Sequence, residues 1–321
     1  MRRSMVAVVG VGGILAVGTG AFLLGAARWR RETADALDRL LATPEPVAAP
    51  VVAAGDELPA PVARYFEFAL PDGAHRIEKA RVRWEGEFRM GPDAAWAPFT
   101  ATQHFTALPP GFVWDADIRM MSVLRVRVRD SYARGRASML GRVAGLVPVV
   151  DQSGSTELAQ SALARWLGEA VWLPTALLPT GDGDAVRWEP VDDSTARATV
   201  TDGAVRASAE FRFAPTGEIR SMTALRYRDV DGEPVLTPFE GLYHDYVRRD
   251  GFMVPGEAEV AWLLPEGQFA YWRGRPVEVR YEPAASAGSA GSAGGSRAPG
   301  RASFSPEGGG RRNAGGPQGR G

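Results

Sequence analysis

The segment RVRWEGEFRM, residues 81–90, alternates charged and apolar side chains almost without a break. The even positions are Val82, Trp84, Gly86, Phe88 and Met90, and every odd position is Arg or Glu. Successive side chains of a β-strand point to opposite faces, so the segment predicts a strand with one apolar and one solvated face. The pattern recurs in residues 124–129, 257–262 and 277–282. Such strands are typical of an antiparallel sheet with one wet face, and they argue against a parallel α/β core.

The predicted strands fall into two groups on either side of a helical segment. The first group lies near residues 77–90, 98–107, 111–120, 123–133 and 136–149, and the second near 185–189, 195–201, 204–214, 218–229, 235–248, 253–263 and 269–281. Between the groups, Ser155 is expected to cap a helix that extends to about Trp172. A shorter helix is expected after Leu58, because prolines are tolerated in a first helical turn.

The composition excludes several classes of protein. The chain has 321 residues, an apolar fraction of 45%, a net charge of −1 and no cysteine. Disulfides, thiolate metal sites and a cysteine nucleophile are therefore excluded, and the charge gives no reason to expect a nucleic-acid partner. The histidines, His75, His104 and His244, lack metal-ligand spacing, so we expect no metal and no cofactor. No catalytic motif is present, which favours a non-enzymatic role.

The first segment predicts a membrane anchor. Residues 5–27 contain no charged side chain, and arginines flank them on both sides. A run of this length can span a hydrocarbon core of about 30 Å. A cleaved signal peptide is the alternative, but arginines directly after the candidate cleavage site disfavour it. The flanking arginines are nearly balanced, and we place the globular domain on the extracytoplasmic side of the cell membrane.

Four parts are expected along the chain. A single transmembrane anchor covers residues 1–28, followed by a juxtamembrane helix and a Pro/Ala-rich linker over residues 29–57. An antiparallel β half-barrel domain covers residues 58–283. Residues 284–321 are rich in Gly, Ala and Arg and are expected to form a disordered tail.

The expected sheet is too wide for its helices to cover. About eleven strands at about 4.8 Å spacing give a width of roughly 50 Å, whereas two helices of about 10 Å diameter cover roughly 20 Å. We therefore expect a mainly β (α+β) fold, with one large curved antiparallel sheet whose concave side is plugged by helices. Large apolar surfaces are seldom left bare unless they bind something, so a hydrophobic cavity is predicted on that side.

Two groups of residues are candidates for this cavity. The aromatic candidates for its wall are Trp84, Phe88, Phe105, Trp114, Trp166, Trp172, Phe211 and Trp262. The polar candidates for its mouth, which would hold a ligand head group, are Asp151, Glu157, Glu169 and Arg226. The alternative for each aromatic side chain is ordinary core packing, and for Glu169 it is a helix-surface ion pair with Arg165.

The chain also resembles a known family. The segments LPAPVARY (residues 58–65), WAPF (96–99), WLPTALLP (172–179) and RYR (226–228) are similar to those of an uncharacterised bacterial family. Its members carry an N-terminal membrane segment followed by a domain of unknown function, so the resemblance implies no activity. The order of helix, strands, helical insert and strands is also similar to that of half-barrel carriers that move lipoproteins across the periplasm, which is an analogy of topology.

Three functions stay open at this point. The first is a membrane-tethered binding protein or carrier for a lipid or other hydrophobic ligand in the bacterial cell envelope. The second is a non-catalytic structural or interaction module of the envelope, in which the apolar face is filled core. The third is a hydrolase or isomerase that uses carboxylates in the same cavity. The sequence predicts neither the ligand nor the oligomeric state.

Overall fold

The computed structural model describes residues 23–42, 58–120, 124–179 and 186–283. Most of the predicted anchor and the whole of the predicted tail lie outside these ranges. Among the described residues, no helix combines the length and the apolar character needed to cross a membrane. The predicted transmembrane helix is therefore not supported by the structure.

Within the described residues, thirteen strands form one antiparallel sheet in the order β6-β5-β4-β3-β2-β1-β15-β14-β11-β10-β9-β8-β7. The strands are β1 (Ile77–Phe88), β2 (Ala97–Thr106), β3 (Gly111–Arg119), β4 (Arg125–Ala133), β5 (Arg136–Val143), β6 (Val147–Ser153), β7 (Arg187–Asp192), β8 (Thr195–Asp202), β9 (Val205–Phe213), β10 (Ile219–Val230), β11 (Glu233–His244), β14 (Glu257–Leu264) and β15 (Gly267–Pro283). Strands β1 and β15 pair in the middle and join two meanders. Within the described ranges β6 and β7 do not pair with each other, so the sheet is open.

Two predicted strands are each interrupted. The segment predicted over residues 136–149 is the hairpin β5–β6, because Ala144 and Gly145 adopt positive φ and reverse the chain. The segment predicted over residues 235–248 breaks after β11, where Asp245 has a φ of 52°. The chain then forms the separate two-stranded sheet of β12 (Val247–Arg249) and β13 (Phe252–Val254).

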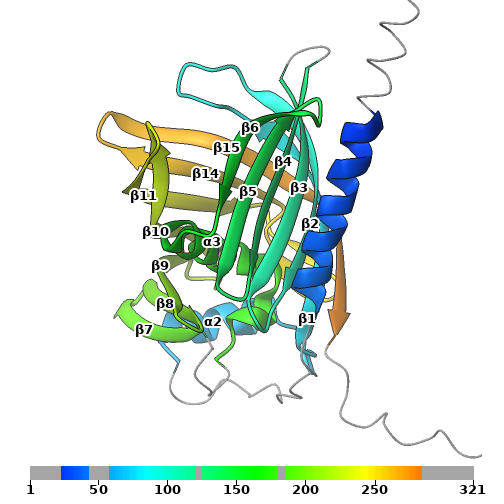
Figure 1. Ribbon diagram of the computed structural model, residues 1–321. Helices are drawn as coiled ribbons and strands as arrows, with labels where there is room; N and C mark the ends of the chain where they lie inside the picture. The colour runs from blue at the N-terminus through cyan, green and yellow to red at the C-terminus, as the bar shows by residue number, and fades with distance from the viewer. Residues whose placement is uncertain (1–22, 43–57, 121–123, 180–185, 284–321) are drawn as a thin grey trace, which may run out of the picture. The chain divides into compact units, whose positions relative to one another are not determined.

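The sheet bends around helix α3 (Thr156–Glu169). This helix contacts β3, β4 and β5 on one side and β9 and β10 on the other, so both halves of the sheet face it (Figure 1). Its start is fixed as predicted, since the Ser155 hydroxyl accepts a 3.1 Å hydrogen bond from the Leu158 amide. Helix α2 (Ala60–Ala69) begins with prolines and packs against β8, β9 and β13. The expectation of helices on the concave side of a curved sheet agrees with these contacts.

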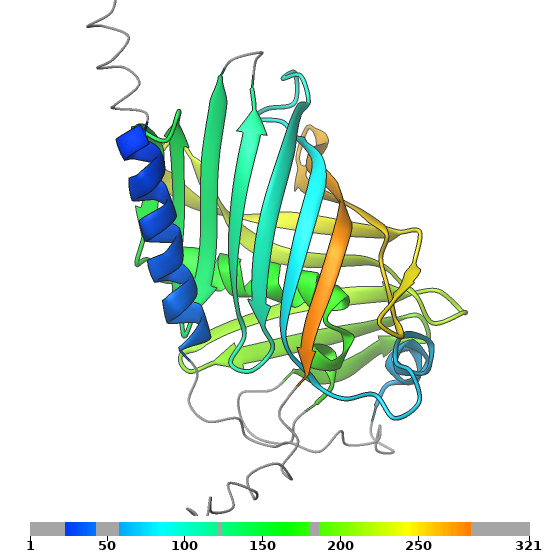
Figure 2. The same ribbon diagram turned by 90° about the vertical axis from the view of Figure 1, so that its right-hand side faces the viewer.

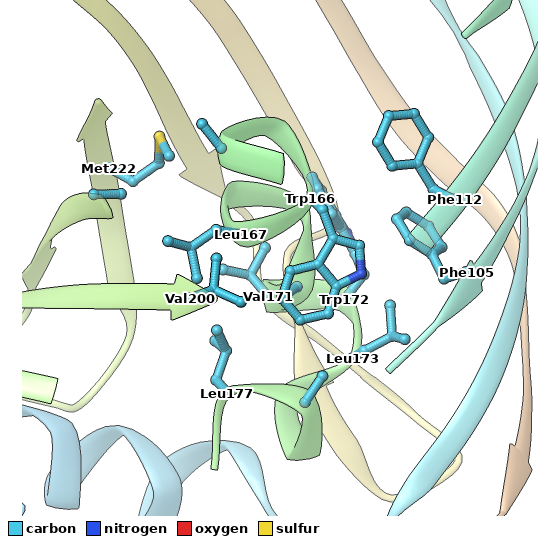
Figure 3. Packing of buried hydrophobic residues seen from close by; sticks show 14 of the residues in the cluster. Phe105, Phe112, Trp166, Leu167, Val171, Trp172, Leu173, Leu177, Val200 and Met222 are labelled. Carbon is cyan, nitrogen blue, oxygen red and sulfur yellow. The ribbon is translucent and has the colours of Figure 1, made fainter. Parts of the chain in front are cut away.

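The WLPTALLP segment after α3 is part of the core. Figure 3 shows Trp172, Leu173 and Leu177 pointing between the two halves of the sheet. The segment forms two short 3₁₀ turns, η1 (Ala170–Trp172) and η2 (Pro174–Leu177). The Trp172 indole donates a 3.0 Å hydrogen bond to the Pro255 carbonyl, and the Leu177 carbonyl accepts one of 2.9 Å from Trp188. These bonds satisfy buried N–H groups, so the WLPTALLP segment has a packing role.

The outer face of the sheet is not fully solvated, contrary to the expectation of one wet face. Residues 23–41 form a helix, here called the N-terminal helix, which includes the juxtamembrane helix predicted at the start of residues 29–57 and begins before it. It lies along the outer face of the sheet, as Figure 2 shows. Trp29 and Leu40 are buried there. Arg129 and Arg142, on outward-facing positions of β4 and β5, are consequently 3% and 9% exposed.

Candidate functional site on the concave face

A group of polar side chains meets on the concave face around Arg165 of α3. Its guanidinium donates a 2.6 Å hydrogen bond to Asp130 of β4 and one of 2.9 Å to Glu169, one helical turn further on. The second oxygen of Glu169 accepts a 2.7 Å hydrogen bond from Gln103 of β2. The guanidinium also lies 4.8 Å from the ring centre of Phe112. Burial alone would lower the pKa of Arg165, but the charges of Glu169 and Asp130 outweigh burial and raise it.

Arg226 of β10 and Tyr271 of β15 extend this group across the concave face. The Nε of Arg226 donates a 3.0 Å hydrogen bond to the Ser161 carbonyl of α3. Burial raises the pKa of Tyr271, while the charges of Arg226 and Arg165 act in the opposite direction. Tyr271 is thus close to both guanidinium groups. We call Gln103, Asp130, Arg165, Glu169, Arg226 and Tyr271 the concave cluster.

A row of aromatic side chains lies next to the concave cluster. Tyr271 stacks on Trp262 at 5.9 Å between ring centres and meets the edge of Phe88 at 5.8 Å. Phe239 continues the row, 5.5 Å from Trp262, and the Arg226 guanidinium lies 4.5 Å from the Phe239 ring centre. Phe88, Trp262 and Tyr271 are only half-buried. We call Phe88, Phe239, Trp262 and Tyr271 the aromatic row.

A β-bulge brings Tyr271 into both groups. The pairing of β14 with β15 shifts between Val260 and Ala261, which leaves Tyr271 as an extra residue in β15. Its neighbour Trp272 also faces the core, where it stacks on Phe99 at 5.7 Å. In a regular strand two successive side chains would point to opposite faces. The alternation rule therefore could not find Tyr271 as a site residue.

The predicted wall residues divide into two sets. The buried ones, which pack into the core with at most 5% exposure, are Trp84, Phe105, Trp114, Trp166, Trp172 and Phe211. Phe88 and Trp262 stay half-buried and belong to the aromatic row. Trp84, for example, meets Trp172 edge-on at 4.8 Å between ring centres. The part of the wall that a ligand could reach is therefore smaller than the sequence predicted.

The predicted polar residues also divide. Glu169 and Arg226 both lie in the concave cluster, close to Tyr271. Asp151 pairs with Leu140 on the outer side of the sheet, while its neighbour Gln152 donates a 2.8 Å hydrogen bond across to Asp229 of β10. Glu157 lies in the first turn of α3, away from the side chains bonded to Arg165. Sequence reasoning missed Gln103 and Asp130, which no local pattern connects to α3.

Two hollows lie away from the concave cluster. A groove of about 390 Å³ runs along the outer face beside Trp29, between Arg83, Glu85 and Asp117. A second, of about 270 Å³, lies between the residues after α2 and Tyr281. Within the described ranges, no group of three or more His, Cys, Asp or Glu side chains is placed to hold a metal ion.

Sequence comparison assigns the chain to a family. The model of a family of unknown function, DUF6544, matches residues 52–274, which is more than half of the chain. The chain belongs to this family. The resemblance to an uncharacterised family is thereby confirmed. A search of curated proteins found no match.

Solved structures with a similar arrangement are distant. A DUF1329 family protein from Desulfovibrio piger is 12% identical and has a TM-score of 0.38, covering 71% of this chain and 95% of its own. A LolA superfamily protein from Nitrosomonas europaea is 13% identical with a TM-score of 0.34, covering 69% and 92%. Both TM-scores are low, so neither similarity assigns a function to this chain.

Proposed function

We propose that this protein is a membrane-tethered binding protein or carrier of the cell envelope that holds an amphiphilic ligand on its concave face. The observation that carries the proposal is the aromatic row directly beside the concave cluster, with Phe88, Trp262 and Tyr271 half-buried. Ligand sites typically combine an apolar lining with a few convergent polar groups, and this arrangement has both. The apolar body of the ligand would lie against Phe88 and Trp262. Its head group would meet Arg226 and Tyr271.

The charges of the site favour an anionic head group. Arg165 is already engaged by two carboxylates, whereas no described carboxylate lies within ion-pair distance of Arg226 or Arg228. Both residues occupy the same face of β10, opposite Thr237 and Val235 of β11. The Nε of Arg228 is buried and lacks a hydrogen-bond partner within the described part of the chain. A carboxylate or phosphate would satisfy such groups through charge-assisted hydrogen bonds.

The membrane tether is the second part of the proposal. Residues 5–27 would anchor the protein in the cell membrane, because they lack charge over a length that can span the hydrocarbon core. The globular domain would lie on the extracytoplasmic side. Full-length protein should then sediment with membranes and resist carbonate extraction. A mature N-terminus near residue 28 would show that the segment is a cleaved signal peptide instead.

Two measurements test the ligand. Native mass spectrometry of the purified protein should show co-purified lipid. A fluorescent fatty acid should bind more tightly than its uncharged methyl ester, and Arg226→Gln should remove that difference while leaving ester binding in place. Arg220→Gln is the matched control, because Arg220 lies on the same strand, is exposed and pairs only loosely with Glu218 at 3.7 Å. Equal binding of acid and ester to the unmodified protein would refute the anionic head group.

A structural or interaction module of the envelope is the second candidate. The observation that favours it is the dense packing of six of the eight predicted wall aromatics in the core. If the protein carries no lipid and binds neither the fatty acid nor its ester, this candidate replaces the carrier.

A further inference from the structure

Exposed apolar side chains gather where the N-terminal helix begins. They are Leu23 (60% exposed), Leu24 (73%), Leu146 (43%), Val147 (60%) and Val149 (54%), and we call them the apolar rim. The two chain segments that form the rim touch, because a Cβ at Gly25 would lie only 2.5 Å from the Leu146 Cδ2 atom. The start of the helix therefore lies directly against the β5–β6 turn.

The rim lies at one end of the β1–β6 half of the sheet. Since neighbouring strands are antiparallel, the β1–β2 connection and the β5–β6 turn are at the same end, which Figure 2 also shows. Met90, in the β1–β2 connection, is 66% exposed as well. Exposed apolar side chains that gather at one end of a folded domain indicate a binding partner.

The chain itself indicates which partner this surface meets. Residues 5–22 carry no charge and lead directly into Leu23. On the other side of the rim, Arg28, Arg30 and Arg31 are exposed on the first turns of the N-terminal helix. Apolar side chains next to exposed arginines match the boundary between acyl chains and anionic head groups of a lipid bilayer.

We propose that the apolar rim rests on an anionic lipid bilayer, in addition to any insertion of residues 5–27. Leu146, Val147 and Val149 enter the head-group region, while Arg28, Arg30 and Arg31 bind lipid phosphates. The helix is docked on the sheet through Trp29, so a membrane contact at its start fixes the orientation of the whole domain. This contact rests on the membrane location in the proposed function, but it does not require a bound ligand.

Site-specific fluorescence can test the contact in the full-length protein. The chain has no cysteine, so Val147→Cys provides one labelling site for an environment-sensitive dye. The protein is reconstituted into vesicles of phosphatidylethanolamine and phosphatidylglycerol that contain a lipid-linked quencher. Val191→Cys is the matched control, because Val191 is 47% exposed on β7, at the opposite edge of the sheet. We expect blue-shifted emission and at least about twofold quenching at position 147 and neither at position 191.

The proposal fails if the two labels behave alike, or if the full-length protein does not float with the vesicles. A second variant separates the rim from the anchor. Val147→Asp with Val149→Asp should leave the melting temperature and flotation unchanged, because both side chains are exposed, but should abolish quenching of a dye at Leu146→Cys. Persistent quenching in that variant would overturn the rim contact. Fatty-acid binding measured in the same samples reports on the proposed ligand site separately.

Discussion

The Trp29 indole donates a 3.0 Å hydrogen bond to the Asp115 carboxylate and so joins the N-terminal helix to the outer face of β3. Arg129 and Arg142 lie 4.8 and 5.7 Å from the indole ring centre, and Glu32 pairs with both guanidinium groups. The charged residues that the alternation assigns to solvent are therefore the docking surface of a helix. Each side chain in this contact has a partner of opposite charge or an aromatic face.

Asp115→Asn should make the domain as stable as, or more stable than, the unmodified protein at pH 7. Burial raises the pKa of Asp115, against hydrogen bonds from Trp29 and Thr33. Above its ordinary value of 3.8 the folded state then binds more protons than the unfolded state, so stability falls as the pH rises through the folded pKa. The asparagine oxygen keeps the bond to Trp29 without the buried charge. Thermal unfolding between pH 4 and pH 7 should show that the stability of Asp115→Asn relative to the unmodified protein decreases at low pH.

Asp115→Ala provides the comparison, because it also removes the acceptor for Trp29 and should destabilise at both pH values. Equal losses for the asparagine and alanine variants would contradict the role of charge burial. Asp117→Asn, two residues further on β3 and paired with the exposed Arg125, should change stability little.

Arg165→Met should destabilise the domain by about 2–4 kcal/mol, because it leaves two partly buried carboxylates without their cation. The side chains of Asp130 and Glu169 are only 11% and 19% exposed, so water can replace little of the lost interaction. Combining Arg165→Met with Asp130→Asn and Glu169→Gln should recover at least half of the loss in urea denaturation. No recovery would indicate that Arg165 acts through packing on Phe112 instead.

Phe88→Ala and Phe105→Ala should distinguish a residue of the ligand surface from a residue of the core by their effects on stability and on probe binding. Phe105 is fully buried, and its truncation should cost about 3–5 kcal/mol. Phe88 is half-buried, so its truncation should cost only about 1–2 kcal/mol while weakening the binding of a hydrophobic probe. Chemical denaturation and probe fluorescence give the two readouts. A full core loss at Phe88 with unchanged probe binding would argue for the structural module.

Gly86→Ala should destabilise the sheet by about 1–3 kcal/mol. A Cβ at this position would collide with the Arg273 carbonyl of the neighbouring strand, which is backbone and cannot rotate away. Gly91→Ala is the control, since a Cβ there meets no atom within 4 Å. Comparable unfolding midpoints for both variants would mean that β1 and β15 can move apart without loss of stability.

Much of the fold follows from local patterns in the chain. Alternation in residues 81–90 predicts β1 and its buried face, and Val82 and Trp84 are indeed in the core. Ser155 predicts the start of α3, and the prolines near residue 60 predict α2. These features depend on the geometry of a few consecutive residues, so the local sequence specifies them. The antiparallel class followed from the same patterns, whereas two of the predicted strands were each divided by a turn.

The concave cluster and the covered outer face depend on long-range pairing instead. Asp130 and Arg165 meet because α3 crosses β4, and Tyr271 joins them because a one-residue bulge in β15 redirects its side chain. The N-terminal helix docks on charged residues that periodicity assigns to solvent. Trp29 binds Asp115, which is 86 residues away in the sequence, and Glu32 binds Arg129, which is 97 residues away. Local stereochemistry specifies which side of a strand a residue occupies, but only the register of the whole sheet specifies what lies opposite it.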